Sequence, residues 1–307
     1  MDFGEYLDEL SDPAKRLKVT GLQRLSNLKP DQARQFAARW PDVNVRRRRR
    51  LVGELQDLAE DNVEFDFSEV FRAGLADEDA QVRLVSVRGL WENQDPGLLD
   101  LLQMLVETDD DAAVRAEAAL ALGRFVLLYE LGRVRERHFE RAAGALRRVI
   151  ENPDDIEEVR ARAIEAMGAH DAAWVRQSIT EAYESGRHRL KVSAVHAMGR
   201  SAEPRWLPLL TRELQSDEPE LRYEAATALG IIGDESAIPN LVTLILDEDE
   251  QVIAAAIGAL GEIGGADARH ALLELLGSES AATREAASEA LAQLDFEADP
   301  LGFRVRD

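Results

Sequence analysis

The feature that most constrains this chain is a repeat of 31 residues. With Arg222 as a reference, steps of 31 residues reach Lys191 and Arg160 in one direction, and Ile253 and Arg284 in the other. After the first four of these positions, an alanine follows at three residues, a methionine or leucine at seven and a glycine at eight. A fixed period of this length indicates stacked copies of one supersecondary unit.

Each repeat predicts two helices. Offsets of three, four and seven residues share one helical face, so the reference positions lie in amphipathic helices whose buried stripe holds small residues that allow close helix packing. Asp77 and Asp217 are expected to cap such helices, and the glycine at offset eight is expected to end them in a left-handed turn. A second apolar pattern follows, with Pro208 and Pro239 in its first turn, where proline is tolerated. Each unit is therefore a helical hairpin that must stack on its neighbours.

The repeat continues towards the N-terminus with two departures. Arg115 and Arg83 extend the series, but Trp91 stands where the glycine belongs. Between Arg115 and Arg160 the spacing is 45 residues, an excess of about four helical turns. We therefore expect a lengthened unit at 124–152, in which the second helix is the longer one.

The two ends are less regular than the middle. Residues 1–76 predict irregular N-terminal capping hairpins, with Phe3, Tyr6, Leu7 and Leu10 on one face of a short first helix that covers the end of the stack. Residues 77–294 are the regular repeats, and 295–307 are predicted to form a C-terminal tail. The whole chain is expected to be one continuous solenoid domain.

The run LRYEAATALGIIGD, with the approximate copies VRAEAALALGRF and VIAAAIGALGEIGG, resembles HEAT repeats, in particular the short HEAT-like repeats of the phycobilin lyase type. This resemblance implies an all-α fold, a right-handed α-α superhelix of about eight to nine helical hairpins. It also implies that the second helices line the concave surface, where a partner would bind. The family consists mainly of scaffolds, adaptors and chaperone-like binders.

The net charge of the chain limits which kinds of macromolecule it can bind. The chain has a formal net charge of −22 and is an acidic protein, which argues against a generic nucleic-acid binder. Residues 216–299 hold 19 acidic side chains against three arginines, a local net charge of −16. This asymmetry is explained either by solubility or by a surface that steers a basic protein partner. No apolar run suits a membrane span and no secretory signal is evident, so we expect a cytoplasmic protein.

The sequence contains no recognisable catalytic or cofactor-binding pattern. Cysteine is absent, and none of the five histidines has a second histidine three or four residues away, so the helical zinc pattern is missing. Iron-binding hydroxylases of the HEAT type use adjacent His-Glu pairs, which this sequence lacks. The glycines of GIIGD and GEIGG recur at the repeat period and are not a phosphate-binding loop. We therefore expect no enzyme activity, cofactor or metal.

Two surface clusters are candidate partner sites. Alignment of the repeats places Trp174 near the edge of the buried stripe, with arginines close by; the predicted partner-binding residues are Trp174, Arg176, Arg205 and Arg212. Packing of Trp174 between second helices explains the pattern equally well. The second cluster is the basic run Arg46, Arg47, Arg48, Arg49 and Arg50, which marks either an anionic-surface patch or a helix with solvated arginines; we favour the helix, because consecutive side chains point around its circumference.

The function that fits best is a non-enzymatic protein-protein interaction scaffold or adaptor that binds its partner on the concave face. One alternative is a phycobilin-lyase-like or chaperone-like protein. Another is nucleic-acid binding through the arginine clusters.

Overall fold

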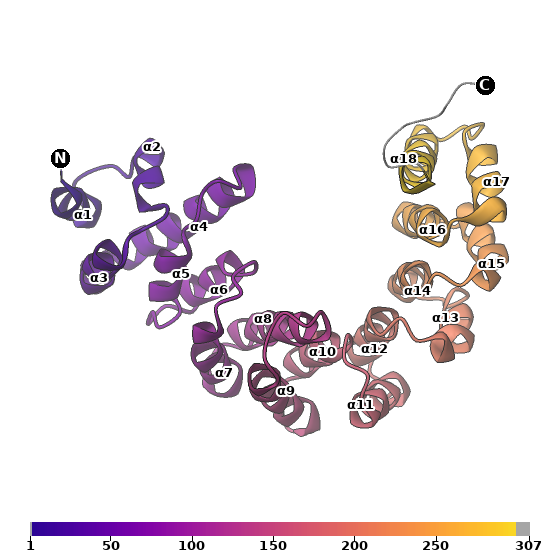
Figure 1. The fold of residues 1–307 in the computed structure, drawn as a ribbon, viewed down its shortest axis with the longest axis horizontal. Coiled ribbons are helices and arrows are strands. Elements are labelled where there is room, and N and C mark those ends of the chain that lie inside the picture. The colour runs from indigo at the N-terminus through magenta and orange to yellow at the C-terminus, as the bar shows by residue number, and fades with distance from the viewer. Residues whose placement is uncertain (1, 299–307) are drawn as a thin grey trace. The chain divides into compact units, whose positions relative to one another are not determined.

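A computed structural model describes residues 2–298, and within them every regular element is helical. The prediction of an all-α, HEAT-like solenoid is confirmed for this part of the chain, which holds eight successive pairs of helices between a first helix, α1, and a last helix, α18 (Figure 1). The helices divide into two compact units near Ala166. Whether the chain acts as one continuous solenoid domain stays a prediction.

The first unit begins with α1, whose residues Tyr6, Leu7 and Leu10 are buried as predicted. The α1 helix packs against α3, and between them only the short segments Val19–Leu22 and Gln23–Leu25 are helical. The helices of this unit are α1 (Phe3–Ser11), α2 (Val19–Leu22), α3 (Pro30–Arg39), α4 (Val45–Asp61), α5 (Ser68–Gly74), α6 (Ala80–Gly89), α7 (Leu99–Thr108), α8 (Ala112–Glu130), α9 (Glu136–Glu151) and most of α10 (Glu157–Met167).

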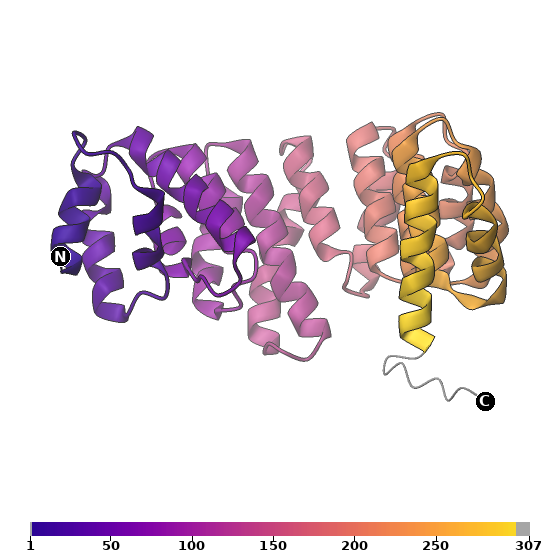
Figure 2. The same ribbon diagram turned by 90° about the horizontal axis from the view of Figure 1, so that it is seen from above.

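The second unit contains the most regular repeats. Its helices are α11 (Ala173–Glu184), α12 (His188–Arg200), α13 (Leu207–Glu213), α14 (Pro219–Ile232), α15 (Ile238–Thr243), α16 (Glu250–Ile263), α17 (Gly265–Leu275) and α18 (Ala281–Ala298). Figure 2 shows α18, in yellow, running beside the other helices of this unit. It ends at Ala298, so the start of the predicted tail at 295 is four residues too early, and the remainder, 299–307, lies outside the described residues.

The extra residues of the lengthened unit are shared between its two helices. The α8 helix has 19 residues and α9 has 16, whereas the first helices α12, α14 and α16 have 13 or 14. The expectation that only the second helix is longer is therefore wrong. The α8 helix ends at Glu130 with Leu131 as its C-cap, because Gly132 adopts a positive φ of 67° and turns the chain.

The repeated glycines have a different role from the predicted one. Gly199, Gly230 and Gly261 lie inside α12, α14 and α16, and none has a positive φ; the left-handed turns are formed instead by Gly233 and Gly264. A Cβ built on Gly199 would lie 2.7 Å from the Cα of Ala228, so these glycines let the backbones of neighbouring first helices approach. The predicted N-caps are also shifted, to Asp79 for α6 and Glu218 for α14.

This close packing decides which way the second unit bends. Its first helices α12, α14, α16 and α18 contact one another closely, whereas α13, α15 and α17 contact one another little. Figure 1 accordingly shows the first helices of this unit on the inner side of its bend and the second helices on the outer side. The expectation that second helices line the concave surface is therefore wrong here, because the glycine and alanine stripe shortens the row of first helices.

Two reference arginines of the repeat join the loops before and after their hairpin. Arg83 bonds the carboxylate of Asp109 at 2.6 Å through Nε, and its Nη1 donates to the carbonyl of Asp77. Arg222 repeats the pattern with Asp247, at 2.7 Å, and with the carbonyl of Ser216. At these two positions the repeated arginine thus forms a structural bond between the loops on either side of one hairpin.

Candidate protein-binding surfaces

The most pronounced aromatic feature of the surface is Trp91, whose side chain is 64% exposed. It follows the end of α6, where Leu90 is the C-cap and the amide of Trp91 donates to the carbonyl of Arg88. Gly89 stands where the other repeats carry alanine, and it packs on the preceding helix α5, where an added Cβ would lie 2.5 Å from the ring of Phe71. The α6 helix ends at this glycine, so Trp91 lies beyond it, in the turn that follows.

Trp91 lies on the wall of a groove in the first unit. The groove has a volume of about 570 Å³ and is formed by the end of α4, the 62–67 segment, the start of α5 and the turn after α6. Val63, which is 93% exposed, and Phe65 supply further apolar surface. The guanidinium of Arg124 lies 6.0 Å from the centre of the Trp91 ring and helps to hold the indole in place.

The rim of this groove is acidic. Glu60, Asp66 and Glu92 contribute carboxylates, and the single lining arginine, Arg88, already bonds Glu117 of α8 at 2.8 Å. The 62–67 segment is held by the amide of Asn27, which donates to the carbonyl of Asp66 at 2.7 Å. The groove therefore combines a fixed shape, an exposed indole and a negative rim, which are the features of a binding site for a segment with apolar and basic side chains.

The predicted cluster on the second helices is placed on two elements of the second unit. Trp174 and Arg176 lie in the first turn of α11, and Trp174 is half-buried. Arg176 pairs with Asp171, and Arg205, which lies just before α13, pairs with Glu203. These arginine charges are thus balanced locally, and both elements belong to the outer row of the second unit.

Arg212, the fourth residue of that prediction, contributes to a different group. It donates to the hydroxyl of Tyr183, near the C-terminal end of α11, about nine residues and 13 Å along the helix from Trp174. Tyr183 also donates to the buried carboxylate of Glu213, which accepts a hydrogen bond from Lys191 at 2.8 Å. Burial raises the pKa of Tyr183, and the hydroxyl stays neutral. This fully bonded group fixes α13 on α11 and α12.

The basic run is mostly engaged inside the first unit. Arg47 donates to backbone carbonyls of the segment before α2, Arg48 is buried against Asp77 and Glu78, Arg49 bonds Asp79, and Arg50 bonds Glu54 within α4. The side chain of Arg46 is exposed. These contacts favour the structural interpretation of the run. The acidic partners Asp77, Glu78 and Asp79 lie about 30 positions further along the chain, so the sequence alone did not connect them with the arginines.

A second groove lies on the first-helix face of the second unit. It has a volume of about 630 Å³, lies between α14 and α16, and is lined by Glu218, Glu220, Glu224 and Asp249 around the exposed ring of Tyr223. On its α12 side, His188 bonds Glu220 at 2.9 Å and His196 bonds Glu224 at 3.2 Å. Acidic side chains of the C-terminal third therefore gather around the first turns of α14 and α16.

Neither a metal centre nor a membrane segment is found among residues 2–298. Groups of three or more histidine or acidic side chains that suit a metal ion are absent from this part of the chain. In the same range, no helix has the length and apolarity needed to cross a bilayer.

Comparison with known families assigns the chain. The model of HEAT repeats matches residues 68–168, 177–260 and 241–301. The chain belongs to the HEAT repeat family. The irregular hairpins before residue 68 lie outside the matched ranges.

Several solved structures are similar to this chain at low sequence identity. Human deoxyhypusine hydroxylase is 18% identical over 95% of this chain and 97% of its own, with a TM-score of 0.33. The CpcE and CpcF complex of phycocyanin lyase from Nostoc is 20% identical over 74% of this chain and 94% of its own, with a TM-score of 0.48. Kap121p is 16% identical, over 96% of this chain and 34% of its own, with a TM-score of 0.45. No curated protein matches the sequence.

Proposed function

We propose that this HEAT repeat protein is a non-enzymatic scaffold of the cytoplasm that binds a segment of a partner protein in the Trp91 groove. The observation that carries the proposal is the exposed indole of Trp91 on the wall of a preformed groove with an acidic rim. Large exposed aromatic side chains anchor protein interfaces because they bury much apolar area with little loss of conformational entropy.

The chemistry of the groove specifies the segment. An apolar side chain would pack on Trp91 and Phe65, and a lysine or arginine would face Glu60, Asp66 and Glu92. The negative charge of the chain attracts such a segment over a distance of about one Debye length. The proposal thus replaces the second-helix surface with a groove on the first unit as the principal partner site.

The test compares a variant of the groove with a variant of an exposed apolar residue elsewhere. The protein and its Trp91→Ser variant are used to capture partners from the source cells, with Leu246→Ser as the matched control, since Leu246 is also exposed but lies in the second unit. We expect a partner retained by the control and lost by Trp91→Ser, with a dissociation constant at least about 30-fold weaker, the effect of removing a hot spot of about 2 kcal/mol. Equal retention by both variants would refute the groove.

The competing proposals are tested separately. A Trp174→Ser variant tests the cluster of Trp174, Arg176, Arg205 and Arg212, and the loss of a partner with this variant alone would move the site to the second helices. A phycobilin-lyase-like function requires an absorbance shift when bilin is added. Nucleic-acid binding through Arg46–Arg50 requires electrophoretic retardation at near-physiological salt.

A further inference from the structure

The lengthened unit carries a projection that the function proposed above does not use. The α8 and α14 helices both begin three residues before their reference arginines, Arg115 and Arg222, but α14 ends ten residues after its arginine and α8 ends fifteen residues after. The five additional residues extend α8 by about 7 Å. Figure 2 shows the turn between α8 and α9, in magenta, extending beyond the neighbouring helices of the first unit.

This turn has a fixed conformation. The amide of Gly132, which has a φ of 67°, donates to the carbonyl of Tyr129 at 2.8 Å, and the amide of Arg133 donates to that of Leu128, also at 2.8 Å. Together these two bonds form a Schellman turn. On the other side, the rings of Tyr129 and Phe139 stack between the two helices, with centres 4.3 Å apart. A partner therefore binds the turn without the entropy cost of ordering it.

The turn presents an apolar side chain and an excess of positive charge. Leu131 is 56% exposed. Residues 131–138 have a local net charge of +2 in a chain of −22, from one glutamate and three exposed arginines, Arg133, Arg135 and Arg137. Arg133 and Arg135 form no ion pair with another residue in the described range 2–298. Their charges are therefore available to an anionic surface.

The positive potential of the turn also acts on its histidine. Arg137 Nε donates to the ring of His138 at 3.1 Å, and a neutral ring does not cancel the charge of the arginine. Burial lowers the pKa of His138, and the charges of Arg137, Arg135 and Arg141 lower it further. The ring is therefore neutral at pH 7, and the arginines alone carry the positive charge of the turn.

A groove of complementary chemistry lies in the second unit. It has a volume of about 600 Å³ and is formed by the beginnings of α16 and α18, the end of α17 and the turns before α16 and α18. Its apolar walls include the half-buried Ile253 and Leu275, and Leu246, which is 88% exposed. Among the described residues that line it there is no cation, and the exposed carboxylates are those of Glu248, Glu250 and Glu274. Asp247, also in the lining, is already bonded by Arg222.

We propose that the turn between α8 and α9 of one copy docks in this groove of a second copy of the chain. Leu131 packs on the apolar walls, and Arg133 and Arg135 face the glutamates of the rim. The contact joins different surfaces of the two copies, so each copy keeps one turn or one groove free for a further copy. Two copies of charge −22 repel each other at long range, but the Debye length at physiological salt is about 8 Å, so the opposite charges in contact decide the association.

Analytical ultracentrifugation of the full chain measures this association. At a salt concentration of about 0.15 M, we expect the average mass to rise above that of one chain as the protein concentration increases. At about 0.5 M salt, the dissociation constant should be at least about fivefold higher, because the ion pairs are screened. A mass that stays that of one chain at every concentration, or a dissociation constant that does not change with salt, would overturn the proposal.

Two variants, each altered on one side of the contact, test the pairing directly. The turn variant carries Arg133→Glu and Arg135→Glu, and the groove variant carries Glu248→Lys and Glu250→Lys. All four side chains are exposed, so both variants should fold. Each variant alone should associate at least about tenfold more weakly than the wild-type protein. An equimolar mixture should associate again, because the groove variant supplies an unchanged turn and the turn variant an unchanged groove.

The matched control changes the net charge by the same amount elsewhere on the first unit. It carries Arg46→Glu and Arg50→Glu, both at exposed positions of α4, and should associate like the wild-type protein. A control as weak as the turn variant would show that net charge, and not the turn, governs association. No association in the mixture, with both variants folded by circular dichroism, would refute the pairing of turn and groove.

Discussion

The contact between first helices predicts opposite effects for the same substitution at two glycines of the second unit. In Gly199→Ala, the new methyl would lie 2.7 Å from both Cα and Cβ of Ala228, and because a Cα atom cannot rotate away, the helices must separate. Overpacking of this kind costs about 1–3 kcal/mol, and we take the upper end because backbone is involved. Alanine also favours the helix by about 1 kcal/mol relative to glycine, so the net loss in the free energy of unfolding is about 2 kcal/mol.

Gly258→Ala is the matched control. Gly258 lies in α16 with no atom within 4 Å of an added Cβ, so the variant gains helix propensity alone and should be stabilised by about 0.5–1 kcal/mol. Gly261→Ala is intermediate, since its nearest neighbour is the Ala290 methyl at 3.0 Å, and should be nearly neutral.

Equilibrium urea unfolding, followed by circular dichroism, measures this series. For an m-value of about 2 kcal/mol/M, Gly199→Ala should lower the midpoint of the second unit by about 1 M. A midpoint equal to or above that of the wild-type protein would show that these helices are not in backbone contact. A similar loss in Gly258→Ala would show that alanine acts through something other than the contact.

Three further predictions concern buried or charged groups. Tyr6→Phe should raise the unfolding free energy by about 1 kcal/mol in urea, because it removes an unpaired buried hydroxyl, and a loss of stability would mean that the oxygen is bonded in the folded protein. Arg48→Met should lower the unfolding free energy by about 3–5 kcal/mol, since it leaves Asp77 buried without its cation, whereas the exposed Arg50→Met should change it by less than about 0.5 kcal/mol. The Arg222 hydrogen bond holds the pKa of Asp247 below its ordinary value of about 3.9. The stabilisation that this bond provides is therefore complete above that pH and is lost as the pH falls through the pKa of Asp247 in the folded protein. Asp247→Asn should lose less stability than the wild-type protein between pH 5 and pH 3, and equal losses would contradict the bond.

The repeat was readable from the sequence because its period and its apolar offsets follow directly from helical geometry. Pro208 and Pro239 lie in the first turns of α13 and α15 as expected. The role of the glycines was misread, because a glycine near the end of a helix suits both a left-handed turn and a close contact. The deciding signal was the alanine six residues after each reference position, such as Ala228, which is the surface that the preceding glycine meets.

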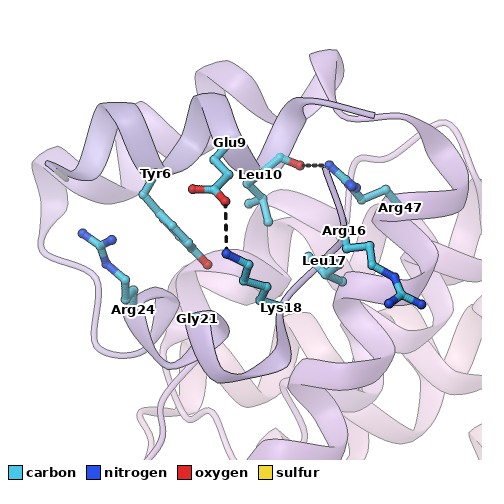
Figure 3. A pocket seen from close by; sticks show the side chains of 9 residues that line it. All are labelled: Tyr6, Glu9, Leu10, Arg16, Leu17, Lys18, Gly21, Arg24 and Arg47. Carbon is cyan, nitrogen blue, oxygen red and sulfur yellow. Dashed lines mark hydrogen bonds and ion pairs between the residues drawn. The ribbon is translucent and has the colours of Figure 1, made fainter. Parts of the chain in front are cut away.

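The candidate sites were harder to predict, because they depend on contacts between residues far apart in the sequence. Trp91 was visible as a break in the repeat, but its exposure follows from the end of α6 at Gly89 and the packing of that residue on Phe71. The position of the segment before α2 depends on Arg47, which binds carbonyls 32 or more residues earlier (Figure 3). The same contact engages one arginine of the run that had suggested a basic patch, so this arginine is not available to an outside partner.

The close packing of first helices also brings acidic side chains of the second unit together. Neighbouring first helices that share glycine and alanine contacts bring their polar residues together, and between α12 and α14 this pairs His188 with Glu220 and His196 with Glu224. Between α14 and α16 the facing groups are carboxylates on both sides, including Glu218 and Asp249, without a cation among the lining residues. A basic segment would relieve their mutual repulsion, so we expect this groove to attract such a segment even without a specific bond. Neutralising the carboxylates of this groove should therefore slow the association of a basic partner more than it changes its dissociation.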